Sequence, residues 1–131
     1  MNILIYKKEY EFHTTPMENI VLNPYSIEID IDNIEEERYR ILIKPYIAFK
    51  VVTIDCVSSR DYFHEYCYRD GRFHRHILEI ENSPWIEQLG KNIAYHNGHI
   101  LRDVKHFVLP LQDIVIEVIA KELVITKLCS D

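Results

Sequence analysis

Hydrophobic and polar side chains alternate one by one in two neighbouring stretches of the chain, residues 25–31 and 39–43. From Tyr25 to Ile31, every second position is apolar and the positions between are polar: Tyr25, Ile27, Ile29 and Ile31 against Ser26, Glu28 and Asp30. A period of two is typical of a β-strand with one buried face and one solvated face. After an acidic turn at residues 32–37, Tyr39, Ile41 and Ile43 restart the alternation, so the pattern predicts a β-hairpin.

Further apolar runs predict more strands. Pro45 indicates an edge or a bend, and the nearly continuous β-branched run from Ile47 to Val57 predicts a central strand. The Asp70-Gly71 pair predicts a two-residue hairpin between residues 62–69 and 72–81. The chain closes with three strand-like runs: Val104–Leu109, Ile114–Ile119 and Leu123–Thr126. For Ile114–Leu123, a helix is the alternative.

One segment carries a clear helix signal. Ser83 can cap free backbone amides, and Pro84 suits the first helical position because no donor is missed there. Trp85, Ile86 and Leu89 share one face and are expected to dock on the sheet, and Gly90 is a candidate helix end. Residues 14–18 resemble a capping box and predict one further short helical turn.

These elements predict an α+β fold. We expect a mainly antiparallel β-sheet of about six to eight strands with one short helix, near residues 83–90, packed on it. The 131 residues suit a single domain, and 47% hydrophobic residues suit a packed core. No repeat or linker divides residues 1–131.

Charge and cysteine content narrow the expected partners. A net charge of −6 disfavours nucleic acid and anionic membranes and leaves a basic protein admissible. The N-terminal apolar run is too short for a signal peptide, and no stretch is long enough to cross a bilayer. Three cysteines without C-x-x-C spacing fit free thiols, so we expect a cytoplasmic protein.

Histidines are the candidate metal ligands. His74 and His76 lie two apart in a predicted strand, so both imidazoles leave the same face, as two ligands of one divalent transition metal would. His106, in a later strand, could complete the site if the fold brings it there. Otherwise these are ordinary surface or strand histidines, and no other cofactor is predicted.

No complete catalytic set is visible in the sequence. Cys56, Cys67, Ser58 and Ser59 lie in no nucleophile motif, and three glycines leave little material for a phosphate-binding loop. Five acidic residues instead lie close together in the predicted hairpin: Glu28, Asp30, Glu35, Glu36 and Glu37. They could form a binding patch for a basic partner protein, or they could be an ordinary solvated face.

Several short motifs recur in the same order in other proteins. Residues 39–51, then E-N-S-P-W-I at 81–86, K-H-F at 105–107, Asp113 and E-V-I-A at 117–120 together resemble a group of small uncharacterised bacterial proteins. The resemblance covers roughly the last two-thirds of the chain and implies no established activity. Some small bacterial proteins of this kind lie beside toxin genes and act as immunity factors.

Two functions therefore remain open. The first is a non-catalytic protein-binding module, either of the immunity type or associating with a second copy of itself. The second is a small metal-dependent enzyme that uses His74 and His76 with another histidine.

Overall fold

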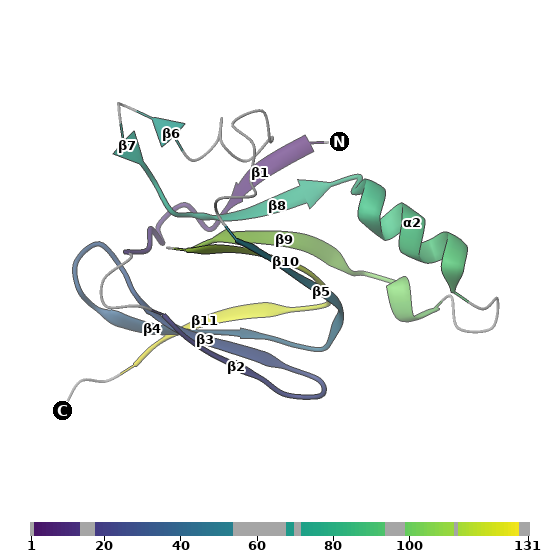
Figure 1. The fold of residues 1–131 in the computed structure, drawn as a ribbon, viewed down its shortest axis with the longest axis horizontal. Helices are drawn as coiled ribbons and strands as arrows, with labels where there is room; N and C mark the ends of the chain where they lie inside the picture. The colour runs from purple at the N-terminus through teal and green to yellow at the C-terminus, as the bar shows by residue number, and fades with distance from the viewer. Residues whose placement is uncertain are drawn as a thin grey trace.

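Two antiparallel β-sheets face each other in the computed structural model (Figure 1). The structure describes residues 2–13, 18–53, 68–69, 72–93, 99–111 and 113–128. The larger sheet has five strands in the order β1-β8-β9-β10-β5, and the smaller has four in the order β11-β4-β3-β2. No helix in these residues is long and apolar enough to span a membrane.

The five-stranded sheet combines the first strand of the chain with strands from its middle and later parts. Its strands, in sheet order, are β1 (Asn2–Tyr6), β8 (Ile77–Glu81), β9 (Lys105–Pro110), β10 (Ile114–Ala120) and β5 (Tyr46–Thr53). Leu111 N–H donates to the carbonyl of Ile114, at 2.9 Å, and closes the hairpin between β9 and β10. That hairpin forms the middle of the sheet.

The four-stranded sheet contains the hairpin that the alternating pattern predicted. Its strands are β11 (Leu123–Lys127), β4 (Arg38–Ile43), β3 (Ile27–Asp32) and β2 (Asn19–Leu22). Asn33 builds the turn between β3 and β4, because its side-chain oxygen accepts from the amides of Glu35 and Glu37. Around the cis Lys44–Pro45 bond the chain leaves this sheet and enters β5 of the other, as a bend at Pro45 requires.

The main core lies between the two sheets. Ile27, Ile29 and Ile31 point inward from β3, and their exposed fractions are at most 1%. Phe107 and Ile116 meet them from the five-stranded sheet. A smaller cluster on the opposite face of that sheet buries Leu78, Ile80, Val108 and Val115. The central strands β8, β9 and β10 therefore carry buried side chains on both faces.

Helix α2 (Pro84–Asn92) starts where the sequence predicted. Ser83 Oγ accepts a hydrogen bond from Ile86 N–H at 3.3 Å. The helix runs past Gly90 to Asn92, and none of its residues is buried. Figure 1 shows why: α2 projects beyond the end of β8 instead of lying across the sheet. It contacts the sheet through its first turn, not along the whole predicted face.

The structure corrects several other expectations. The two sheets contain nine strands, not six to eight, and a short pair, β6 (Tyr68–Arg69) with β7 (Arg72–Phe73), adds to them. The run from Ile47 forms β5, an edge strand with half-exposed residues, not a central one. Tyr25 precedes β3 and is 79% exposed, so it does not share the buried face. Ile114–Leu123 is β-structure, not helix.

The α+β class and the antiparallel pairing are confirmed. The predicted helical turn at residues 14–18 and the three cysteines lie largely or wholly outside the described residues. So do Ser58, Ser59 and the Asp70-Gly71 turn, although the flanking strands β6 and β7 pair as a hairpin requires.

Candidate functional site

Glu11, His74 and His76 meet at one end of the five-stranded sheet. Each offers one ligand atom, and these atoms all lie within 4.8 Å of one another. Glu11 Oε1 contacts His74 Nδ1 directly and lies 3.8 Å from His76 Nε2. The histidines precede β8 in an irregular segment, whereas Glu11 comes from the segment after β1, 63 residues earlier than His74.

The backbone around Phe12 holds these two segments together. Phe12 N–H donates to the carbonyl of Arg75 at 2.8 Å, and Arg75 lies between the two histidines. The Phe12 side chain is only 6% exposed and belongs to the main core. The position of Glu11 against the histidines is therefore fixed by core packing on one side and by a backbone hydrogen bond on the other.

His106 lies elsewhere, on the outer face of the five-stranded sheet. Its Nε2 is 2.8 Å from Glu117 Oε1, and its Nδ1 is 2.6 Å from Ser83 Oγ. A carboxylate can only accept, so Nε2 donates to Glu117, and in the neutral ring Nδ1 accepts from the Ser83 hydroxyl. Both His106 and Ser83 are buried, with exposed fractions of 3% and 5%.

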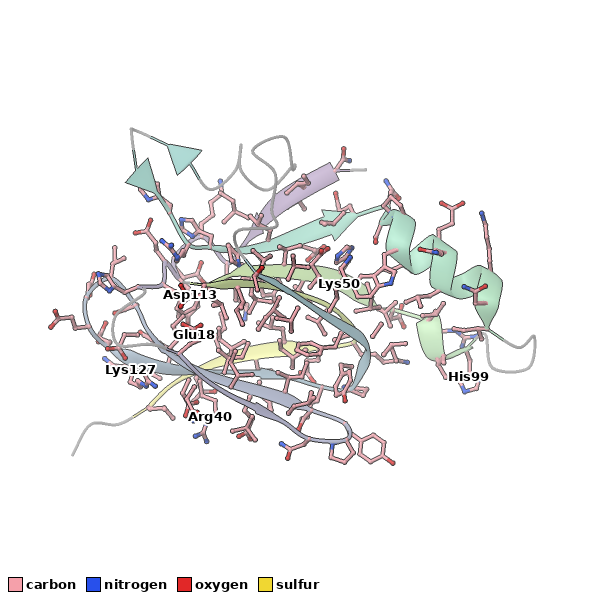
Figure 2. The ribbon with its side chains drawn as sticks, in the orientation of Figure 1. Glu18, Arg40, Lys50, His99, Asp113 and Lys127 are labelled. Carbon is pink, nitrogen blue, oxygen red and sulfur yellow. The ribbon has the colours of Figure 1, made fainter. Side chains whose placement is uncertain are left out.

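Two further side chains complete this polar cluster. Lys50 Nζ is 3.3 Å from Glu117 Oε2 and 4.7 Å from the centre of the Trp85 ring. Trp85 packs edge-on against His106, with ring centres 5.3 Å apart. Figure 2 labels Lys50 on the upper, five-stranded sheet. The E-N-S-P-W-I, K-H-F and E-V-I-A motifs thus supply Ser83, Trp85, His106 and Glu117 to one cluster.

Serine, histidine and carboxylate follow one another as in a hydrolase triad, but with the ring nitrogens exchanged: Ser83 bonds Nδ1 and Glu117 bonds Nε2, whereas the triad serine bonds Nε2. A surface pocket of about 340 Å³, lined by Asn82, Ser83, Ile86 and Glu87, lies beside the serine. However, the residue after Ser83 is Pro84, which has no N–H to donate to an oxyanion at the position used by nucleophile-elbow hydrolases. Ser83 Oγ also already caps α2. Through Ser83, Trp85 and His106 the cluster connects the first turn of α2 to the sheet.

The five acidic residues of the predicted patch are not equivalent. Arg40 binds Asp30 through two hydrogen bonds, of 2.8 and 3.1 Å, which hold the pKa of the Asp30 carboxyl below its usual value. Lys127 bonds Glu37 and likewise lowers the pKa of that carboxyl. Among the described residues, neither Glu28 nor Glu36 forms an ion pair.

Glu28 lies in a row that crosses the outer face of the four-stranded sheet. Strand register places it between Leu42 of β4 and Val21 of β2, and Val124 of β11 pairs with Leu42. Val21 and Val124 are 42% and 39% exposed. We call Val124, Leu42, Glu28 and Val21 the outer row. Figure 2 labels Arg40, from the neighbouring row, on this lower side of the molecule.

The sequence located part of these sites. The structure brings His74 and His76 together, but it places His106 in the separate cluster with Ser83. Glu11 was missed because no motif marks it and it is distant in the chain. The sequence analysis also missed that Glu117 and Lys50 belong to the cluster around His106. Glu117 could have been found, because it is a charged side chain in an otherwise apolar strand.

Comparison with known proteins adds no further assignment: no protein-family model, no curated protein and no solved structure matches the chain significantly.

Proposed function

We propose that this protein is a non-catalytic binding module that captures a basic protein on the outer row of its four-stranded sheet. The supporting observation is the outer row itself, where the Glu28 carboxylate, without an ion pair among the described residues, is flanked by the partly buried Leu42 and the exposed Val21. Apolar contact gives affinity, and a carboxylate at its centre selects a cationic partner.

The hairpin between β2 and β3, which follows Val21 in the chain, carries two further exposed side chains. Leu22 is 54% exposed and Tyr25 is 79% exposed. Tyrosine is enriched among the residues that dominate binding energy at protein interfaces, because it offers a large, rigid and amphipathic contact area.

Charge favours a basic partner over a second copy of the chain. The net charge of −6 makes two copies repel, whereas it attracts a basic protein and raises its association rate. An immunity-type role fits this proposal, since such a module acts by binding a toxin and needs no catalytic group. We place this role in the cytoplasm, in keeping with the odd number of cysteines without metal-type spacing.

The first experiment identifies the partner at this surface. A photo-crosslinking amino acid replaces Val21 in one variant and Leu4, which is similarly exposed at 45% on β1, in a control variant. In the cells from which the gene comes, we expect an adduct with a basic protein from position 21 and none from position 4. An adduct of twice the chain mass, or no adduct at position 21, contradicts the proposal.

The second experiment measures binding of the purified crosslinked protein by calorimetry and stopped flow. Glu28→Lys is expected to slow association roughly tenfold at low salt, because it reverses the charge that attracts the partner. Glu81→Lys is the matched control, since Glu81 is an exposed carboxylate on β8 of the other sheet. Equal effects of the two substitutions would show that the partner binds elsewhere or responds only to net charge.

A further inference from the structure

The Glu11, His74 and His76 cluster shares no residue with the outer row and has no part in the proposed binding of a basic protein. Its three side chains are well shielded, with exposed side-chain fractions of 16%, 12% and 7%. Among the described residues, no lysine or arginine forms an ion pair with Glu11. A shielded carboxylate between two imidazoles needs a compensating positive charge, from a proton or from a cation.

The hydrogen bond made by His76 orients its ring for metal binding. His76 Nδ1 lies 2.9 Å from the backbone carbonyl of Tyr10. A carbonyl only accepts, so Nδ1 carries the hydrogen, and the lone pair of the neutral ring is on Nε2, the atom that faces Glu11. Metal-bound histidines commonly donate their second ring N–H to a backbone carbonyl in this way, which fixes the tautomer and the ring plane.

The carbonyl that orients His76 is itself held in place. Tyr10 packs edge-on against Tyr39 of the four-stranded sheet, with ring centres 5.4 Å apart. Its neighbour Glu11 is fixed by the bond from Phe12 to Arg75 described above. The His74 and His76 rings are 6.4 Å apart and inclined by 18°, so both present nitrogen atoms toward the same carboxylate. The support of the site is thus built into both sheets.

We propose that Glu11, His74 and His76 bind one Zn²⁺ ion. Two imidazoles and one carboxylate are a typical zinc ligand set, whereas Mg²⁺ and Ca²⁺ prefer oxygen alone. A tetrahedral zinc site needs donor atoms about 3.4 Å apart at bond lengths of about 2.0–2.2 Å. All ligand atoms already lie within 4.8 Å of one another, and Glu11 Oε1 is 3.8 Å from His76 Nε2, so only small side-chain adjustments are required.

Three protein ligands leave the fourth position to water or an external ligand. Bound zinc would also join the segment after β1 to the segment before β8, so it should stabilise the folded chain as any ligand of the native state does.

The test uses the full-length chain, freed of metal with a chelator and titrated with ZnCl₂ in a calorimeter. We expect one Zn²⁺ per chain with micromolar or tighter affinity and a higher melting temperature. His76→Ala and Glu11→Gln should each weaken binding by roughly 10- to 100-fold or more. His99→Ala is the matched control, because His99 is exposed and lies beyond the sheet, as Figure 2 shows.

Glu11→Gln retains the shape of the side chain and provides a test if His76→Ala fails to fold. Co²⁺ provides an independent readout, since a tetrahedral site with two nitrogen ligands gives visible absorption bands that Glu11→Gln should change. Absence of zinc binding, or equal binding by the wild type and Glu11→Gln, would overturn the proposal. Loss of binding in His99→Ala alone would place the ion elsewhere on the chain.

Discussion

Replacing His106 with alanine should destabilise the fold substantially, because three interactions of a buried ring disappear together. The hydrogen bonds at 2.6 Å to Ser83 and 2.8 Å to Glu117 are lost, and so is the edge contact with Trp85. A hydrogen bond to a charged group contributes about 1.5–3 kcal/mol, and an aromatic edge contact about 0.5–1.5 kcal/mol. Part of this loss in stability is avoided, because Ser83 still caps α2 and Glu117 still contacts Lys50 in the variant.

We therefore expect His106→Ala to lower the free energy of unfolding by about 3 kcal/mol. For a chain of 131 residues this corresponds to a melting temperature lower by roughly 9–15 °C. Urea titration followed by circular dichroism measures this change in the free energy of unfolding directly. The slope of that free energy against urea concentration should stay unchanged if the denatured state is unaffected. Hydrogen exchange should also accelerate in α2, which this cluster ties to the sheet.

The matched control is His99→Ala, because His99 is exposed and should change stability by no more than about 0.5 kcal/mol. A loss of less than about 1 kcal/mol for His106→Ala would refute the structural role of the cluster. Unchanged exchange in α2 would refute it as well.

Three further outcomes are expected. Phe107→Ala, at a position 1% exposed between the sheets, should cost about 3–5 kcal/mol by urea titration, whereas Val124→Ser on the outer row should cost little. Arg40 lowers the pKa of Asp30 in the folded chain, so the Asp30 carboxylate stabilises the fold above its unfolded pKa of about 3.9. This contribution is lost as the pH falls through the pKa of the folded state. Asp30→Asn should remove this part of the acid sensitivity in unfolding curves measured across that pH range. Ser83→Ala should lower stability by about 1–2 kcal/mol through loss of the helix cap and the His106 bond, and no ester hydrolysis by the wild type should depend on Ser83.

Local patterns in the sequence predicted the local structure well. The alternation through β3 and β4 was readable because one face of each strand is fully buried, so that every second residue had to be apolar. The start of α2 was equally readable, because the Ser83 cap and Pro84 act within a single turn. Both signals depend on neighbours in the chain and not on the rest of the fold.

The arrangement of strands could not be read in the same way. β5 has a continuous apolar sequence, yet it is an edge strand, because strand order depends on pairing with β10 some 60 residues away rather than on its own composition. β2 is short and has three exposed residues, so its sequence carried little signal. α2 lies beyond the sheet because β8 ends directly before it, a geometry that helix periodicity does not encode.

The candidate sites show the same division. The spacing of His74 and His76 indicated two imidazoles on one side of the chain, and both do approach one carboxylate. Glu11 could not be found, because its contact with His74 spans 63 residues and depends on long-range contacts such as the Phe12 bond to Arg75. The acidic residues were visible as a group, but their neutralisation by Arg40 and Lys127 depends on strand pairing within the four-stranded sheet.

Hydrogen exchange of the chain with and without its captured basic partner tests the proposed function most directly. Binding on the outer row should slow exchange in β2, its hairpin to β3 and β11, because these edge strands carry Val21 and Val124. Exchange in β1 and β5, the edges of the other sheet, should stay unchanged. Protection confined to β1 or β5, with none in β2 or β11, would contradict the account.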